Sequence, residues 1–525
     1  MRREEMIGRI RERQGAAEPW DIVVIGGGAT GMGVAVDAAA RGLSVALIEA
    51  HDFGKGTSSR STKLVHGGVR YLEQGNIPLV MSALKERGLM RQNAPHLVHD
   101  LAFVVPNYSW WEAPFYGIGL KLYDLLAGRY GFGASKLLSK EETLERLPAL
   151  EADELRGGVV YYDGQFDDAR LLVHLAMTAA DHSAVLANYC PATGLLRDAE
   201  GYVNGVTARD EETGEELTLM ARVVVNATGV FTDSIRQMAD ANAEPLMITS
   251  QGIHLVFDRS FLKSDTALMV PKTSDGRVLF VIPWHGHAVA GTTDTPVDAP
   301  SLEPRPLEEE IEFVLETAAR FFARPPTRAD VLAVFVGLRP LVRAPGGGEA
   351  KTSAVSRDHV IHVDTSGLLT ITGGKWTTYR HMAEDCVDHA ITLGKLADVD
   401  CPTKNLRIHG YMENSAELEA LEVYGADAAQ IRALAAAEPA LAAQLHPALP
   451  YIAAEVVWAA REEMARTVED ALARHTRALF LNANAAIAMA EPVARLLAAE
   501  LGRDDAWIAA QVGEFTALAQ QYRVM

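Results

Sequence analysis

The 525-residue sequence predicts an α/β fold that combines a parallel βαβ unit, a separate antiparallel sheet and a C-terminal helical domain. A strand, turn, helix and strand pattern occupies residues 21–49, and short apolar runs alternate with turns over 246–295. From about residue 403, Ala, Leu and Glu dominate with helical periodicity. The chain is too long for one ordinary core, so these features are expected to belong to separate units.

The composition of the chain limits its class of function. The hydrophobic fraction of 48% and the charged fraction of 22% are typical of a globular protein. The net charge of −20 argues against a nucleic-acid partner, which would need a basic face. The cysteines Cys190, Cys386 and Cys401 lack metal-ligand spacing, so we expect a reducing compartment and no bound metal.

The N-terminal segment and the hydropathy indicate no membrane span. Residues 1–20 are charged and contain no apolar run of signal-peptide length, so they are expected to be a lead-in to the first strand. Nowhere does the sequence reach the ~18 consecutive apolar residues that a spanning helix needs. We therefore expect a protein that is soluble or that sits on a membrane surface.

The glycines of the first turn predict a dinucleotide site. The apolar run at 21–25 is followed by Gly26, Gly28 and Gly31, which make a G-x-G-x-x-G pattern before an alanine-rich helix. These glycines allow a tight turn, a close approach of a pyrophosphate and packing of the helix on the sheet. Glu49 ends the second strand, where a carboxylate accepts hydrogen bonds from a ribose 2′-OH.

Two later segments favour FAD over a nicotinamide cofactor. Residues 57–66, TSSRSTKLVH, supply several hydroxyls directly after the βαβ unit and are suited to wrap a long cofactor. The sequence Ala227-Thr228-Gly229 ends an apolar strand with small residues, as needed where a chain passes close to a bound cofactor. Further βαβ units, which a nicotinamide enzyme would more often have, do not follow.

Motifs dispersed along most of the chain resemble one family. The sequence is similar to the aerobic, FAD-dependent glycerol-3-phosphate dehydrogenases, including the mitochondrial type. The similar blocks, in the family's order, are GTSSRSTKLVHGGVRYLEQG (56–75), TSDGRVLFVIPW (273–284), AGTTDTP (290–296), GLRPLV (337–342), SRDHV (356–360), GGKWTTYR (373–380) and RTVEDALARHTRALFLNANAA (466–486).

The resemblance implies a domain organisation. It implies a Rossmann-like FAD-binding domain of the glutathione-reductase/amino-acid-oxidase type, a substrate cap on an antiparallel sheet, and a C-terminal helical domain. The expected segments are 1–20 for the lead-in, 21–76, 157–245 and 345–395 for the discontinuous FAD domain, 77–156 and 246–344 for the cap, and 403–525 for the helical domain.

The resemblance also implies a reaction and its partners. The family oxidises sn-glycerol 3-phosphate to dihydroxyacetone phosphate and passes the electrons through FAD to a membrane quinone. The implied location is cytoplasmic, at the inner face of the cell membrane, to which the enzyme is bound peripherally. The aromatic-rich segment 107–135 is the candidate for membrane contact, with a buried cap helix as the equally weighted alternative. Whether the chain forms a homodimer stays open.

The matching motifs carry candidate substrate-binding and catalytic residues. Oxidation of a secondary alcohol needs a base for the hydroxyl proton, and a phosphate needs fixed cations. His254 in QGIHLV is the favoured base, and Lys375 is the alternative; Arg339 would also stabilise the developing alkoxide. The candidates for substrate binding are Arg70, Tyr71, Arg339, Arg357 and Lys375.

The candidates for FAD binding come from the same motifs and from the glycine turn. Ala192 is added as a backbone contact on the adenine side. The expected residues are Gly26, Gly28, Gly31, Glu49, Thr57, Ser58, Ser61, Lys63, Leu64, His66, Ala192, Ala227, Gly229, Gly374 and Thr377.

Three other functions stay open on the sequence alone. The first is an oxidase of the same fold that passes electrons to O₂ and releases hydrogen peroxide. The second is an amine or amino-acid oxidase, which would bind a carboxylate where this sequence places four cations. The third is a flavoprotein that has lost catalysis and serves as a membrane scaffold. The sequence identifies neither the quinone nor its entry path, nor a role for the helical domain.

Overall fold

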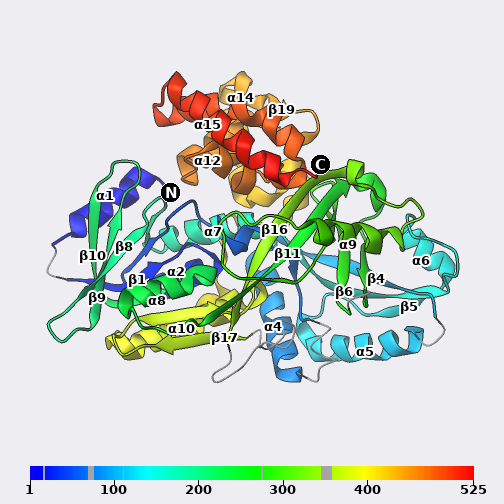
Figure 1. The fold of residues 1–525 in the computed structure, drawn as a ribbon, viewed down its shortest axis with the longest axis horizontal. Helices are drawn as coiled ribbons and strands as arrows, with labels where there is room; N and C mark the ends of the chain where they lie inside the picture. Colours follow the sequence, from blue (N-terminus) through cyan, green and yellow to red (C-terminus); the bar gives the residue numbers. More distant parts are fainter. Residues whose placement is uncertain (16–17, 69–75, 110–111, 274–275, 344–357, 525) are drawn as a thin grey trace.

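The N-terminal βαβ unit lies at the centre of an eight-stranded sheet (Figure 1). The computed structural model describes residues 1–525 except 16–17, 69–75, 110–111, 274–275, 344–357 and 525. The main strand order is β17-β18-β10-β1-β2-β7, in which all neighbours except β17 and β18 run parallel. The strands are β1 (Trp20–Ile25), β2 (Val45–Ile48), β7 (Val185–Ala187), β8 (Ala192–Arg197), β9 (Val203–Arg209), β10 (Glu216–Asn226), β17 (His359–Val363) and β18 (Leu369–Gly373).

Helices cover this sheet and bury its apolar strands. β1 is buried along nearly its whole length, as expected for a central parallel strand. The alanine-rich helix α2 packs between α7 and α10. The lead-in forms α1, and its buried Arg3 makes an ion pair of 2.6 Å with Asp210. The helices are α1 (Arg3–Arg13), α2 (Ala29–Ala40), α7 (Asp168–Asp181), α8 (Thr232–Ala239) and α10 (Tyr379–Gly394).

A second sheet of ten strands forms the cap. Its main order is β15-β11-β14-β13-β12-β4-β6-β3, with β16 paired to β11 and β5 paired to β6. All these pairs are antiparallel except β4 with β12. The strands are β3 (Leu64–Val65), β4 (Val98–Asn107), β5 (Lys136–Leu138), β6 (Gly157–Phe166), β11 (Met247–Asp258), β12 (Ala267–Val270), β13 (Leu279–Trp284), β14 (His287–Gly291), β15 (Thr295–Val297) and β16 (Val331–Val342).

Two strands that we assigned to the FAD domain belong to the cap sheet instead. β6 pairs with β4 over its full length, from Gly157 opposite Asn107 to Phe166 opposite Val98. The short strand β3 pairs with the end of β6. The expected boundary at residue 157 is therefore wrong. The sequence at 157–163 predicts a strand, but it carries no signal that says which sheet the strand joins.

Among the described residues, the helices α4 (Ile77–Asn93), α5 (Glu112–Ala127), α6 (Lys140–Arg146) and α9 (Glu308–Ala319) pack against the cap sheet. Helix α5 lies beside α4 at the outer edge of the molecule (Figure 1). In the part of the chain that the structure describes, no helix combines the length and apolar character needed to cross a bilayer.

The C-terminal segment forms a helical domain on one side of both sheets (Figure 1). Its Phe480 packs against Phe335 of β16, with 5.0 Å between the ring centroids. The domain contains α11 (Ala428–Ala437), α12 (Ala453–Glu462), a π-helix (Asp470–His475), α13 (Ala478–Leu481), α14 (Ala483–Leu501) and α15 (Asp505–Ala519), with a hairpin of β19 (Gln444–His446) and β20 (Leu449–Ile452). The predicted fold class is confirmed.

Candidate active site

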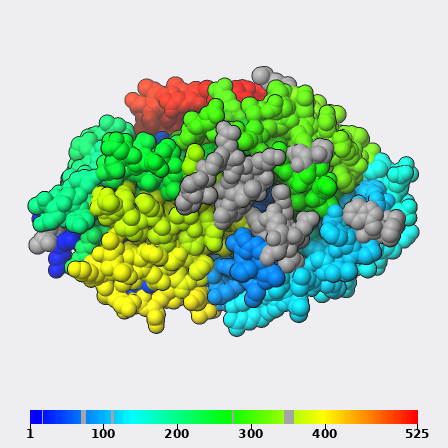
Figure 2. All heavy atoms as spheres, turned by 60° about the horizontal axis from the view of Figure 1, so that its bottom comes forward, coloured from blue at the N-terminus to red at the C-terminus, as the bar shows by residue number. Residues whose placement is uncertain are grey.

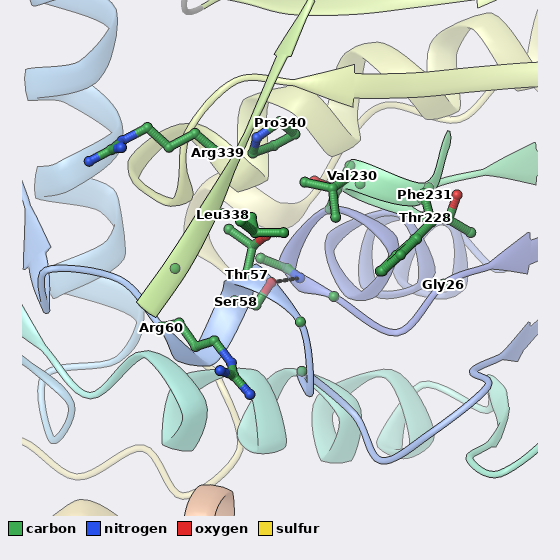
Figure 3. A pocket seen from close by; sticks show the side chains of 18 of the residues that line it. Gly26, Thr57, Ser58, Arg60, Thr228, Val230, Phe231, Leu338, Arg339 and Pro340 are labelled. Atoms are coloured by element: carbon green, nitrogen blue, oxygen red, sulfur yellow. Dashed lines mark hydrogen bonds between the residues drawn. The ribbon is translucent and has the colours of Figure 1, made fainter. Parts of the chain in front are cut away.

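A cavity of about 660 Å³ lies between the two sheets. The parallel strands β1, β2, β10 and β18 all end at it, and the residues that follow them line it: Gly26, Glu49, Ala227 and Gly374. Ligands of open parallel sheets bind at these carboxyl ends. On the other side, β11 and β16 of the cap close the cavity, and Figure 3 shows Leu338 of β16 over Thr57 and Ser58.

The first turn can hold only glycine at two positions. Gly26 has a φ of +112°, and a Cβ there would lie 2.7 Å from the carbonyl oxygen of Ala227. A Cβ at Gly31 would lie 1.9 Å from the carbonyl oxygen of Gly26. Because the turn is made of glycines, no side chains separate the backbone at the start of α2 from the cavity. The helix begins after Gly28, which provides no side-chain cap. Free N–H groups and the positive end of the helix dipole suit a pyrophosphate.

Glu49 is held in place at the end of β2. Its Oε2 accepts a hydrogen bond of 2.6 Å from the N–H of Gly27, and its Oε1 accepts one of 2.9 Å from the N–H of His51. Burial raises the pKa of this carboxyl, and the two backbone donors oppose that rise. A fixed carboxylate oxygen at this strand end is the acceptor that a ribose hydroxyl requires.

The hydroxyl-rich loop 57–63 passes between α2 and β16. Thr57, Ser58 and Ser61 line the cavity, and the Oγ of Ser58 accepts a hydrogen bond of 2.9 Å from the N–H of Ala29 (Figure 3). The indole N–H of Trp376 donates to the carbonyl oxygen of Ser58 at 2.8 Å. Unlike Thr57, Ser58 and Ser61, the side chain of Lys63 does not line the cavity, because it is fully buried behind the loop.

His254 lies on β11 at the cap side of the cavity. Its Nε2 lies 2.9 Å from Oγ1 of Thr62, and its ring stacks on Phe335 at 4.7 Å with an interplanar angle of 13°. Burial and then the charges of Lys63 and Arg339 hold the pKa of His254 well below its ordinary value. The imidazole is therefore neutral near pH 7 and has a lone pair that can accept a proton.

Arg339 lies on β16 and reaches across β11. It donates to the carbonyl oxygens of Gln251 at 3.0 Å and Thr293 at 2.7 Å, and makes an ion pair of 3.2 Å with Asp294. Gly252 leaves room for this side chain, since a Cβ there would lie 2.5 Å from Nη2 of Arg339. A guanidinium fixed by backbone carbonyls is suited to bind an anion in the cavity.

The remaining expected residues fall into two groups. Lys375 follows the end of β18 and lines the cavity. The other cofactor candidates that line it are Leu64, His66, Ala192, Gly229 and Thr377. The substrate candidates Arg70, Tyr71 and Arg357 lie outside the described residues.

The cavity residues that sequence reasoning missed include Thr62, Trp376 and Arg60. Thr62 contacts His254, Trp376 holds the loop, and Arg60 lines the cavity while binding both carboxylate oxygens of Glu303 at 2.8 Å. Figure 3 shows the side chain of Arg60 directed away from Leu338. All three belong to the motif blocks that resemble the family, and this resemblance could have identified them. Their partners are between 192 and 318 residues distant in sequence.

The fold and the site together define a FAD-dependent oxidoreductase. The glycine turn, where a Cβ would clash with the backbone, the buried carboxylate at the end of β2 and the cavity at the strand ends all fit a flavin dinucleotide. The sequence pattern described as FAD dependent oxidoreductase matches residues 21–380, and that of the C-terminal domain of alpha-glycerophosphate oxidase matches residues 369–508. The cofactor of this chain is FAD.

Known proteins define the family more narrowly. A mitochondrial glycerol-3-phosphate dehydrogenase of Arabidopsis thaliana is 42% identical over 92% of this chain and 83% of its own length. The mitochondrial glycerol-3-phosphate dehydrogenase of Homo sapiens is 41% identical over 93% of this chain and 71% of its own length. The solved glycerol-3-phosphate dehydrogenase of Bacillus halodurans, complexed with FAD, has a TM-score of 0.80 and 30% identity, covering 99% and 97% of the two chains. The chain belongs to the glycerol-3-phosphate dehydrogenase family.

Proposed function

We propose that this protein oxidises sn-glycerol 3-phosphate to dihydroxyacetone phosphate and passes the electrons to a membrane quinone. The observation that carries the proposal is the pairing of a neutral imidazole at His254 with the fixed guanidinium of Arg339 in one FAD cavity. Bound FAD supplies the acceptor for the hydride from the carbinol carbon. The names of the similar dehydrogenases support this substrate.

Cations at the cap side of the cavity would bind the phosphate. Arg339 is held rigidly by neighbouring carbonyls and by Asp294, so it loses little side-chain entropy when a phosphate replaces one of these acceptors. Lys375 lines the same cavity, and Arg70 and Arg357 remain expected partners of the phosphate. A carboxylate substrate carries one negative charge and a phosphate ester up to two, so several cations favour the phosphate ester.

His254 would accept the hydroxyl proton of the substrate. The low pKa of its free imidazole ensures that the ring is neutral before substrate binds. A bound phosphate dianion would raise that pKa toward the working range, because a nearby negative charge favours the protonated ring. Thr62 fixes the ring through Nε2. Lys375 is the second candidate for this base.

An exposed apolar stripe on α5 would bind the membrane surface. Phe115, Ile118, Leu122 and Leu125 are spaced three or four residues apart, and their exposed fractions are 54%, 74%, 42% and 76%. Such a stripe on a helix that crosses no bilayer is typical of interfacial binding. In Figure 2, the cyan surface of this region lies open beside the blue surface of α4. We therefore propose peripheral attachment at the inner face of the cell membrane.

A vesicle assay tests this attachment. The paired change Ile118→Asp and Leu125→Asp should abolish cosedimentation with phosphatidylglycerol-containing vesicles while leaving flavin content unchanged. Leu393→Asp, at an exposed leucine of α10, is the matched control and should cosediment like the unchanged protein. Equal cosedimentation of all three proteins would contradict the role of the α5 stripe.

Anaerobic flavin reduction tests the substrate and the acceptor. Glycerol 3-phosphate should bleach the flavin absorbance, and a soluble quinone should restore it. Bleaching by glycine or sarcosine but not by glycerol 3-phosphate would refute the substrate. In air and without quinone, stoichiometric peroxide would instead identify an oxidase. Flavin that no polyol phosphate bleaches would indicate a protein without this catalysis.

A further inference from the structure

The C-terminal helical domain contacts the back of loop 57–63, on the side away from the cavity. Arg477, which precedes α13, donates from Nη2 to the carbonyl oxygen of Ser59 at 2.7 Å. The same guanidinium donates from Nη1 to the carbonyl oxygen of Ala473 at 2.8 Å, so it is fixed within its own domain. The side chain of Arg477 is almost fully buried.

Arg477 and Lys63 share both partners in this contact. The ammonium of Lys63 donates to the carbonyl oxygen of Ser59 at 2.8 Å and to Oδ2 of Asp168 at 2.7 Å. Arg477 reaches Oδ1 of Asp168 at 3.1 Å. Oδ2 of Asp168 also accepts hydrogen bonds from the N–H of Ser61 at 2.9 Å and from its hydroxyl at 2.7 Å. Two cations and one carboxylate therefore fix the backbone of the loop.

The front of the same loop carries the groups of the cavity. Ser58 contacts the first turn of α2, and Thr62 contacts His254. The backbone carbonyls of two successive residues, Ser58 and Ser59, are bound by Trp376 and by the buried cations. A shift at the back of the loop would therefore move Thr62 and alter its contact with the ring of His254.

A second contact fixes the segment that leads into the loop. Arg474 of the π-helix donates from Nε to Oδ2 of buried Asp52 at 2.6 Å. Lys55 makes an ion pair of 2.5 Å with Glu469 of the same domain. These contacts and Arg477 come from one stretch of the helical domain. That stretch lies beyond residue 380, where the match to the FAD-dependent oxidoreductase pattern ends.

We propose that Arg477 is a positioning residue for the oxidation reaction: the C-terminal domain uses it to fix loop 57–63 and thereby the alignment of Thr62 and His254 with the flavin. The proposal rests on the function proposed above for the same cavity. It assigns the helical domain a part in the geometry of the active site. A displacement of about 1 Å between reacting groups lowers rates by about 100-fold.

Substitution of Arg477 tests this role. Arg477→Met keeps much of the side-chain length and removes the donors. We expect flavin reduction at saturating glycerol 3-phosphate to slow by roughly 10- to 100-fold. We expect the half-saturating concentration to change by less than about threefold, because Arg339 stays in place. Arg477→Lys keeps a charged donor and should recover part of the rate. Arg461→Met is the control, since Arg461 forms an exposed ion pair with Glu500 in the same domain.

Two further readouts need no substrate. They are the visible circular dichroism of the bound flavin and the fraction of flavin that stays bound to the protein on gel filtration. Both should change in Arg477→Met and stay unchanged in Arg461→Met. If glycerol 3-phosphate fails to reduce the unchanged protein, the proposed function fails, but these two readouts still test the loop.

If Arg477→Met does not fold, Glu469→Gln is the second variant, because it weakens the contact with Lys55. Its flavin reduction, dichroism and flavin retention should change in the same direction as in Arg477→Met, but by less. An unchanged rate, dichroism and retention in the soluble variants would overturn the proposal.

Discussion

His475 should make the stability of the protein depend on pH in the alkaline range. Its Nδ1 lies 2.6 Å from Oε2 of Glu463, and its Nε2 forms an ion pair of 3.5 Å with Asp52. Burial alone would lower the pKa of this ring, but the two carboxylates outweigh burial and raise the pKa to about 9. The proton is therefore held more tightly in the folded chain than in the unfolded chain.

The sign and size of the effect follow from this difference. A raised pKa stabilises the folded state fully below the unfolded value of 6.5, and the stabilisation is lost as the pH rises through about 9. The free energy of unfolding therefore falls by about 3 kcal/mol over this range, at ~1.36 kcal/mol for each unit of pKa difference between the folded and unfolded chains. The unfolding entropy of a chain of this length is about 1.1 kcal/mol/K, at ~2.1 cal/mol/K per residue, so Tm should fall by about 3 °C.

The assay compares Tm against pH for the unchanged protein and for His475→Gln, both saturated with FAD. Between about pH 6 and pH 9.5, the unchanged protein should lose about 3 °C more than the variant. His446→Gln, at a half-buried histidine of β19, should follow the unchanged protein. Parallel curves for the unchanged protein and His475→Gln would refute the assignment of a raised pKa to His475.

Three further changes test the cavity. His254→Asn should slow flavin reduction by roughly 10²- to 10⁴-fold with normal FAD content, since it removes the base; reduction at the original rate would assign the base to Lys375. Arg339→Met should raise the half-saturating concentration of glycerol 3-phosphate by roughly 10- to 100-fold, the effect of one charged hydrogen bond; an unchanged value would exclude Arg339 from phosphate binding. Gly31→Ala should abolish FAD retention, measured by the ratio of flavin to protein absorbance, because its Cβ would lie 1.9 Å from a carbonyl oxygen; Gly8→Ala, with open space around it, should retain FAD.

Local patterns in the sequence predict the first turn and its partner strand well. The G-x-G-x-x-G turn and Glu49 are specified within about 30 residues, and the structure has the strand, helix and carboxylate in the expected order. The helical periodicity after residue 403 likewise predicts a helical domain. These features depend on neighbours in the chain, so a sequence pattern is enough to find them.

Contacts between distant segments could not be predicted in this way. The run at 157–163 predicts a strand, but its partner β4 is known only from the fold. Lys63 lies in the expected FAD loop, yet a φ of +64° and the carboxylate of Asp168 turn it away from the cavity. The contact between Arg477 and Ser59 spans 418 residues, and no local pattern contains it.

The order of strands in the first sheet bears on how the chain is made. β1 is complete at residue 25, but its neighbour β10 ends at residue 226, and β18, which pairs with β10, ends at residue 373. A ribosome that adds ~5–20 residues each second therefore leaves one backbone edge of the apolar strand β1 unpaired for about ten seconds or more before β10 arrives. We expect this interval to be the period in which nascent chains most need a chaperone, and FAD to bind only after synthesis has passed β18.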